Sequence, residues 1–189
     1  MPTPLGAVLA GGAGSRMGAD KASVDVGGST MLNRVIDAVS DVAPHVVVLG
    51  GDREGQECWP DITPVPGPLA GVATALNRMS EDRVLVVAVD NPFVTVSTLT
   101  HLAEMSSSLP IVPVDDAGVR QVTCAVYPKS VAAVALEEAE SGGSIQTLLD
   151  RVSFEPVTPD VWRSWGEDGR SWYSVDTPES LKAGLEKYG

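Results

Sequence analysis

A glycine-rich loop near the N-terminus carries the residues with the clearest chemistry. Four glycines fall within the eight positions from Gly11 to Gly18, and two cations, Arg16 and Lys21, accompany them. Glycine lets backbone N–H groups approach an anion closely, and the cations supply the charge that three linked phosphates require. The loop is not an ATPase phosphate loop, because no Gly-Lys-Ser/Thr follows, and Met17 replaces the third glycine of a dinucleotide fingerprint. We therefore predict a triphosphate site, the alternative being a flexible connection.

A carboxylate follows the most apolar stretch of the chain. Asp90 comes directly after the aliphatic run from Val84 to Val89, which suits a strand buried on both faces. Magnesium prefers one or two carboxylates together with substrate phosphates, so a single aspartate facing a triphosphate loop is sufficient. We predict that Asp90 holds a magnesium ion. The alternative is that it only begins a turn before Pro92.

The elements that position these residues follow an alternating pattern of strand-length apolar runs and helix-period segments, typical of a parallel sheet covered by helices. Extended segments are expected at 5–10, 22–26, 45–49, 84–89, 111–114, 122–127 and 172–175. Helices are expected at 31–42, from Pro68 onward, and at 96–105, 130–140, 144–152 and 177–187. We predict one doubly wound, Rossmann-like α/β domain over residues 1–189, with a mostly parallel but mixed sheet. Ligands of such sheets bind at the carboxyl ends of the strands, which places the site at the loops after Ala10, Val89 and Val175.

Composition narrows the function classes. The chain has 13 Lys or Arg against 25 Asp or Glu, a net charge of −12, which argues against a nucleic-acid partner. Cys58 and Cys124 lie too far apart to suggest a disulfide framework or a zinc site. The N-terminus lacks a basic leader and no apolar run is long enough to span a bilayer, so we expect no membrane contact and a cytoplasmic location.

Four segments, in the same order, resemble the molybdenum cofactor guanylyltransferase family. They are Leu9-Ala10-Gly11-Gly12 with Arg16, Gly18 and Lys21; Gly67-Pro68-Leu69-Ala70-Gly71; Val89-Asp90-Asn91-Pro92-Phe93; and Val175-Asp176-Thr177-Pro178-Glu179. The resemblance implies a GT-A-like nucleotidyltransferase that transfers GMP from GTP to the terminal phosphate of molybdopterin, with magnesium, and releases pyrophosphate. It further implies GTP and molybdopterin as substrates and transient contact with molybdenum cofactor enzymes.

The resemblance also assigns roles to residues. The nucleotide pocket would be shaped by Leu9, Ala10, Gly11 and Gly12; Arg16 and Lys21 would hold the triphosphate; Asp90 would hold the metal; and Asp61 would be the acidic contact to the nucleotide.

Two positions depart from the family pattern. Gly50-Gly51-Asp52 stands where many members have asparagine, and Asp176 stands in a segment where many have a second asparagine. Asp176 would add a second metal carboxylate. Because the loop 9–12 is retained, we expect GTP to be preferred over CTP.

Two roles are open to a further polar loop and to the late tryptophans: a contact with the pterin or a purely structural one. The loop containing Asp115, Asp116 and Gln121 would either face the pterin or form a solvated turn. The tryptophans at 162, 165 and 172 are expected to form a hydrophobic cluster rather than a pterin platform.

Three alternative functions remain open at the level of sequence. One is the same chemistry with another base or acceptor, either cytidylyl transfer to molybdopterin or nucleotidyl transfer to another small phosphorylated molecule. A nicotinamide oxidoreductase is disfavoured by Met17. The third is a non-catalytic nucleotide-binding regulator. A phosphate acceptor is already ionised at neutral pH, so the proposed transfer needs no general base.

Overall fold

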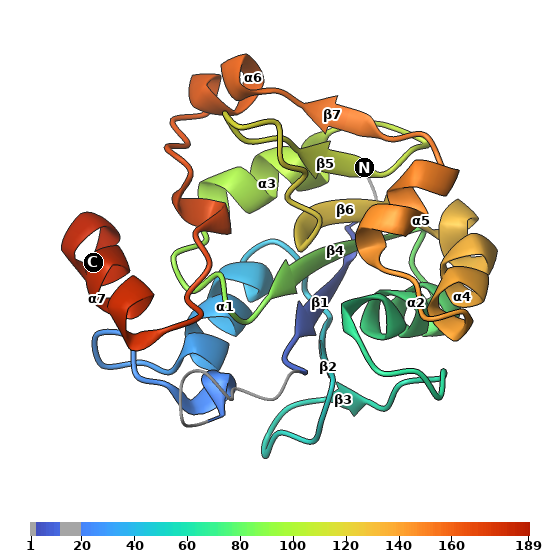
Figure 1. Cartoon of the computed structure of the whole chain (residues 1–189), viewed down its shortest axis with the longest axis horizontal. Helices are drawn as coiled ribbons and strands as arrows, with labels where there is room; N and C mark the ends of the chain where they lie inside the picture. Colours follow the sequence, from blue (N-terminus) through green and yellow to red (C-terminus); the bar gives the residue numbers. More distant parts are fainter. Residues whose placement is uncertain (1–2, 12–19) are drawn as a thin grey trace.

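The protein is built around one mixed β-sheet. The computed structural model describes residues 3–11 and 20–189, and within these ranges the sheet has seven strands in the order β3-β2-β1-β4-β6-β5-β7 (Figure 1). The strands are β1 (Leu5–Leu9), β2 (Val46–Leu49), β3 (Cys58–Trp59), β4 (Arg83–Ala88), β5 (Ile111–Pro113), β6 (Cys124–Pro128) and β7 (Glu155–Val157). Neighbouring strands are parallel except where β6 pairs with β4 and β5. The predicted mostly parallel, mixed sheet is confirmed.

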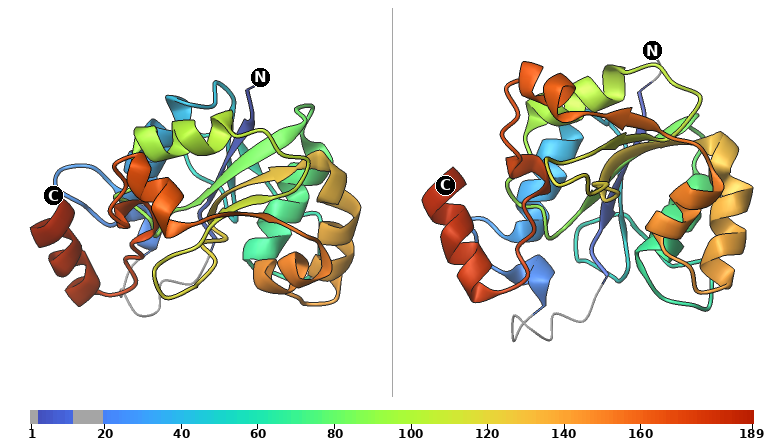
Figure 2. Two further views of the ribbon diagram at one scale, coloured as in Figure 1. Left: turned by 90° about the horizontal axis from the view of Figure 1, so that it is seen from above. Right: turned by 45° about the horizontal axis from the view of Figure 1, so that its top comes forward.

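Helices cover both faces of this sheet (Figure 2). They are α1 (Met31–Ser40), α2 (Pro68–Arg78), α3 (Val96–Glu104), α4 (Ala132–Glu140), α5 (Ile145–Arg151), α6 (Pro159–Ser164) and α7 (Pro178–Tyr188), with short 3-10 turns η1 (Lys21–Ser23), η2 (Lys129–Val131) and η3 (Arg170–Trp172). One core cluster joins the sheet to α1, α3 and α6, and a second joins it to α2, α4 and α5. The fold is therefore doubly wound, as predicted.

Local sequence explains where the main helices begin. The Thr30 hydroxyl accepts a hydrogen bond from the Asn33 N–H at 3.1 Å and caps α1. Pro68 occupies the first turn of α2, where its missing N–H has no intrahelical acceptor. At α7, Thr177 and Ser180 form a reciprocal capping box around Pro178. Each start lies where the sequence predicts it.

Two predicted extended segments are wrong. Residues 22–26 do not form a strand, because the Asp20 carboxylate caps the turn η1 by accepting from the Ala22 N–H at 3.2 Å. In the segment 172–175, Trp172 closes η3 and the residues after it join no strand of the sheet.

Three short elements are absent from the sequence prediction. The strand β3 has only two residues within a segment expected to be a loop, and β7 contains Pro156 at the edge of the sheet. The helix α6 is only six residues long. Such pieces are too short for a periodic pattern to reveal them.

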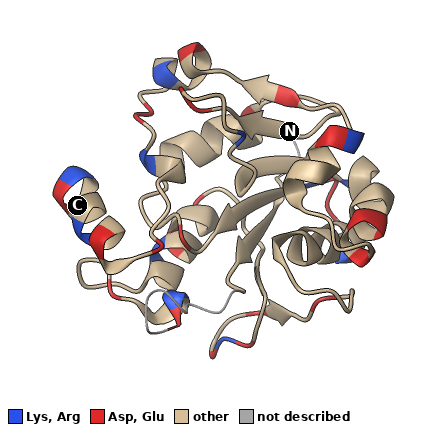
Figure 3. Ribbon diagram, in the orientation of Figure 1, with Lys and Arg blue, Asp and Glu red and all other residues tan. Residues whose placement is uncertain are grey.

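The charges follow the acidic composition. Figure 3 shows Asp and Glu distributed over the helices and their connections, with Lys and Arg scattered between them. None of the helices in the described ranges is both long and apolar enough to cross a membrane.

Two glycines bring the ends of β1 and β2 into close contact. A side-chain Cβ on Gly11 would lie 2.9 Å from the Gly50 Cα, and a Cβ on Gly50 would overlap the Gly11 backbone. Gly50 also has a φ of 93°, which L side chains rarely adopt. Only glycine at both positions allows the two loops to start side by side.

This contact predicts a large effect of Gly50→Ala on stability. We expect a loss of ~3 kcal/mol in the free energy of unfolding, because overpacking adds to backbone strain. Gly55→Ala is the matched control: Gly55 has a φ of 77° with open space around it, so strain alone should cost ~1 kcal/mol. Urea unfolding of both variants measures the difference, and equal losses would contradict the close-contact explanation.

Candidate active site

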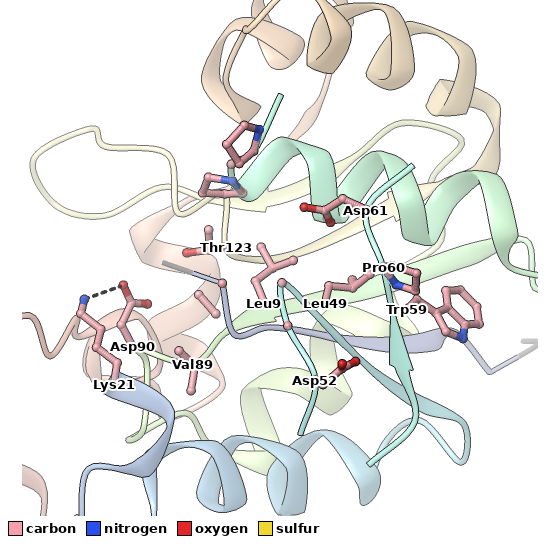
Figure 4. A pocket seen from close by; sticks show the side chains of 18 residues that line it. Leu9, Lys21, Leu49, Asp52, Trp59, Pro60, Asp61, Val89, Asp90 and Thr123 are labelled. Carbon is pink, nitrogen blue, oxygen red and sulfur yellow. Dashed lines mark ion pairs between the residues drawn. The ribbon is translucent and has the colours of Figure 1, made fainter. Parts of the chain in front are cut away.

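A pocket of about 780 Å³ opens at the carboxyl ends of the central strands (Figure 4). Its wall includes Leu9 at the end of β1, Leu49 at the end of β2 and Ala88 at the end of β4. Gly67 and Pro68 close it where α2 begins. This is the edge at which a doubly wound sheet binds its ligands.

Three predicted site residues meet at one end of the pocket. The Lys21 ammonium lies 3.8 Å from the Asp90 carboxylate and also forms an ion pair with Asp176. The Val175 N–H donates to the Asp90 carbonyl at 2.7 Å, which fixes the segment before α7 against the end of β4. Residues far apart in the sequence therefore form one charged cluster, and Figure 4 shows Lys21 reaching toward Asp90.

The electrostatics of this cluster favour a cation. Burial raises the pKa of Asp90, which the Lys21 ammonium opposes. The neighbouring Asp176 carboxylate raises the pKa of Asp90 again, while a hydrogen bond from Ser174 lowers it. Two carboxylates held this close repel each other unless a positive charge lies between them. In this structure the positive charge is Lys21.

A buried glutamate supports the segment that carries Asp176. Glu167 is 6% exposed and accepts hydrogen bonds from the Thr98 and Ser171 hydroxyls and from backbone N–H groups of the following turn. The Ser171 carbonyl accepts in turn from the Asn91 side chain at 3.2 Å. Because Asn91 directly follows Asp90, this network joins the C-terminal segment to the end of β4.

The other end of the pocket is mostly apolar. Asp61 lies there on the segment after β3, away from Lys21 and Asp90 (Figure 4). Partial burial raises the pKa of Asp61. A carboxylate among apolar groups is suited to accept hydrogen bonds from a planar ligand with adjacent donors.

The floor of the pocket requires a glycine in α2. A Cβ on Gly71 would lie 2.8 Å from the Leu9 Cδ2 and 3.3 Å from the Leu49 Cβ. This contact gives a physical reason for the second glycine of the segment Gly67-Pro68-Leu69-Ala70-Gly71.

The structure brings most of the sequence candidates to the pocket. Leu9, Gly11, Lys21, Asp61 and Asp90 line it. Ala10 is buried, and its carbonyl accepts from an arginine at the base of the loop. Asp176 reaches the pocket through Lys21, whereas the predictions for Gly12 and Arg16 lie outside the described residues.

The sequence reasoning missed several residues of the site. Trp59, Thr123 and Asp52 line the pocket without having been assigned to it, and Arg53 contacts Ala10 and Asp20, which flank the glycine-rich loop in the sequence. None of these four residues belongs to a local sequence pattern that marks it, because their neighbours in the structure are distant in the sequence.

The loop after β5 is held by its own contacts. The Asp115 carboxylate accepts from the N–H groups of Ala117 and Val119 at 2.8 and 2.9 Å and from the Gln121 side chain at 2.9 Å. Asp116 pairs with Arg163. These bonds fit the turn interpretation of the loop.

The late tryptophans pack into the core. Trp162 is 2% exposed, donates from its indole N–H to the Val114 carbonyl at 2.9 Å, and contacts Trp172 edge to face. The Trp165 ring stacks on His101 at 4.9 Å. Their contacts are those of a hydrophobic cluster.

His45 braces the outer wall of the pocket. Its ring meets the Trp59 ring at 6.0 Å, edge to face, and the Trp59 indole N–H donates to Glu57 at 2.8 Å. Both imidazole nitrogens face carboxylate oxygens at 3.2 Å, Nδ1 toward Glu81 and Nε2 toward Glu57. The hydrogen bond to Glu81 is the largest effect and raises the pKa of His45; burial, the next largest, opposes it, and the hydrogen bond to Glu57 adds to the rise.

The comparisons with known proteins agree on one family. A family model described as the MobA-like NTP transferase domain matches residues 6–156. The chain is 30% identical over 185 residues to the probable molybdenum cofactor guanylyltransferase of Pelotomaculum thermopropionicum, covering 93% of this chain and 89% of that protein. It is 31% identical over 190 residues to the corresponding protein of Clostridium perfringens, covering 96% of each.

The fold agrees with a solved structure. The crystal structure of molybdopterin-guanine dinucleotide biosynthesis protein A from Archaeoglobus fulgidus matches with a TM-score of 0.84 at 26% identity. The match covers 97% of both chains, so the similarity extends to the C-terminal segment that carries Asp176.

The raised pKa of His45 predicts a pH-dependent contribution to stability. A group whose folded-state pKa is raised stabilises the fold below its unfolded pKa, and the contribution disappears as the pH rises through the folded pKa. We therefore expect His45→Gln to lower the free energy of unfolding more at about pH 6 than at about pH 9. Urea unfolding at both pH values measures this, with Glu104→Gln on the exposed side of α3 as the control. A pH-independent loss would contradict the role of Glu81 and Glu57.

Proposed function

Because this chain belongs to the family of MobA-like NTP transferases, we propose that it transfers GMP from GTP to molybdopterin and releases pyrophosphate. It is a nucleotidyltransferase by family and by fold. The observation that carries the finer assignment is a single pocket with Lys21 and Asp90 at one end and Asp61 at the other. Such a pocket offers separate sites for a triphosphate and for a base.

The triphosphate is assigned to the end of the pocket that holds Lys21. Lys21 is the first residue of η1, directly after its cap Asp20, and it lines the pocket. Lys21 supplies a point charge, and Arg16 would add a directional fork within the loop. In a chain with a net charge of −12, local cations and backbone dipoles must overcome an unfavourable overall field to bind GTP.

Asp90 and Asp176 are the residues that would hold a divalent metal ion, which we assign as magnesium. The Lys21 ammonium contacts both carboxylates, so one cation can lie within reach of both. No group of three or more metal-ligating side chains occurs in the part of the chain that the structure describes, which fits an ion completed by substrate phosphates. When bound, magnesium neutralises charge on the α-phosphate and on the leaving pyrophosphate.

Guanine is assigned to the end of the pocket that holds Asp61. The Watson–Crick edge of guanine presents two adjacent donors, N1–H and the N2 amino group, which match a carboxylate. Cytosine presents an acceptor beside its amino group, so one carboxylate oxygen would be left without a donor. Asp61 is exposed in the free protein and becomes covered only when the base binds. A covered polar group left unpaired costs about 1–3 kcal/mol, so the occupied site should favour guanine.

The residues of the chain bind, orient and neutralise rather than form covalent bonds. The acceptor is a phosphate oxygen, already ionised at neutral pH, and it requires no general base. Release of Lys21 from the two carboxylates frees its ammonium to stabilise the departing pyrophosphate. The apolar wall of the pocket holds the base so that the α-phosphate faces the acceptor.

A nucleotide panel tests the proposal. Pyrophosphate release is measured with GTP, CTP and ATP, each with magnesium and with or without molybdopterin. We expect release only with molybdopterin and a kcat/KM for GTP at least about 100-fold above that for CTP. A value for CTP equal to that for GTP would favour cytidylyl transfer, and no release with any nucleotide would favour a binding protein.

Asp61→Asn should change the ranking of nucleotides. The amide presents one donor where the carboxylate presented an acceptor, so kcat/KM should fall for GTP by about 10- to 100-fold and change little for CTP. Asp52→Asn is the matched control, because Asp52 is a second carboxylate of the same pocket. If the ranking of nucleotides stays unchanged in Asp61→Asn, Asp61 does not contact the base.

Asp90→Asn should lower kcat by about two to three orders of magnitude, comparable to the loss of one preorganised electrostatic group. The change keeps the shape of the side chain while removing the negative charge that would bind a cation. Single-turnover rates at saturating magnesium measure the effect, with Asp37→Asn on the exposed side of α1 as the control. Near-normal magnesium-dependent turnover would contradict the assignment of Asp90.

A further inference from the structure

An arginine outside the pocket joins the two ends of the glycine-rich loop. The Arg53 side chain comes from the connection between β2 and β3 and is 23% exposed. Its Nη2 donates to the Ala10 carbonyl at 3.2 Å, directly before the loop. Its Nη1 and Nη2 lie 2.7 and 3.2 Å from the Asp20 carboxylate, directly after the loop. One guanidinium thus contacts the residues on both sides of the segment 11–19.

The Asp20 end of this contact leads to the charged cluster. Asp20 caps η1, because its carboxylate also accepts from the Ala22 N–H at 3.2 Å. Lys21 is the first residue of that turn, and its ammonium reaches Asp90 and Asp176. Any shift of Asp20 would therefore move the origin of the Lys21 side chain.

The Ala10 end of the contact belongs to the rigid sheet. The Ala10 N–H donates to the Leu49 carbonyl at 2.8 Å, while its carbonyl is left for Arg53. The Arg53 backbone is itself fixed, since its N–H donates to the Cys58 sulfur at 3.2 Å and its carbonyl accepts from the same thiol. Arg53 therefore fixes the position of Asp20 relative to β1, β2 and β3.

The guanidinium is held at an energetic cost. Its Nε is buried and has no hydrogen-bond partner among the residues that the structure describes. An unpaired buried donor is unfavourable, and an arginine on a surface connection could avoid the penalty by turning outward. The arrangement is expected where the contacts of Nη1 and Nη2 stabilise the protein by more than the unpaired Nε destabilises it.

The geometry points to Arg53 as a positioning residue that clamps both ends of the glycine-rich loop and so places Lys21 for the triphosphate. This inference rests on the proposed function and concerns a residue that does not itself line the pocket, although its neighbours Gly51 and Asp52 do. Arg53 acts through Asp20, and the pair works as a unit.

The experiment uses Arg53→Lys, Asp20→Asn and the double variant in the full chain. Arg53→Lys keeps the charge but loses the two-pronged contact, and Asp20→Asn leaves Arg53 in place. Affinity is measured by titration calorimetry for GTP with magnesium and separately for guanosine, which lacks phosphates. Arg151→Lys, whose guanidinium pairs with Glu138 between α4 and α5, is the matched control.

We expect both single variants to bind GTP about tenfold more weakly, because a displaced Asp20 no longer holds Lys21 in place for the triphosphate. The double variant should lose no more GTP affinity than the single variant that binds GTP more weakly, because the effects of two residues that act through one contact are not additive. Guanosine affinity should stay within about twofold, and Tm within about 4 °C. The control should leave both affinities unchanged.

Several outcomes would overturn the clamp. If only Arg53→Lys weakens GTP binding, the arginine contacts phosphate directly. If the two effects multiply in the double variant, the residues act separately, and if guanosine affinity falls equally, the role is general folding support. Wild-type protein that binds GTP no more tightly than guanosine would instead refute the proposed triphosphate site, which distinguishes the two failures.

Discussion

Asp90 and Asp176 repel one another, and the hydrogen bond from the Val175 N–H to the Asp90 carbonyl leaves them little room to separate. Partial burial of Asp90 strengthens the repulsion, since solvent screens this carboxylate less than one on an open surface. The Lys21 ammonium is therefore a requirement of the arrangement rather than one contact among many. It can satisfy that requirement only if the end of β1, the end of β4 and the start of α7 converge, and the rest of the fold brings them there.

That convergence depends on supports that lie behind the pocket. Gly11 and Gly50 allow two backbones to meet where no side chain would fit. Glu167 collects the donors of the C-terminal turn, and through Ser171 and Asn91 it fixes that turn against β4. These groups are buried or close-packed, whereas Lys21, Asp90 and Asp176 lie at the ends of strands and helices. The pocket therefore lies at an edge of the sheet that is held by close packing behind it.

How much of this was predictable depends on whether the signal was local. The spacing of apolar residues predicts the strands β1 and β4 and the helix α1, and Lys21 and Asp90 lie close to these segments in the sequence. Arg53 does not, because its meaning depends on Ala10 and Asp20, more than thirty residues away in the sequence. The same holds for Glu167, whose burial no neighbouring residue foretells. The segment 22–26 failed for the opposite reason: its β-branched residues suggested a strand, but one cap at Asp20 outweighed them.

The antiparallel direction of β6 decides which wall of the pocket can change in length. Its direction is reversed relative to β4, so it begins where β4 ends, and the Thr123 carbonyl accepts from the Ala88 N–H at 2.9 Å beside the pocket. The connection from β5 to β6 therefore lies at the pocket end of the strands, on the side of the sheet opposite β2 and β3. Insertions there would lengthen one wall of the pocket without interrupting β1, β2 or β4. The side of the pocket next to β6 can therefore vary in length while the side formed by β1 and β2 keeps its geometry.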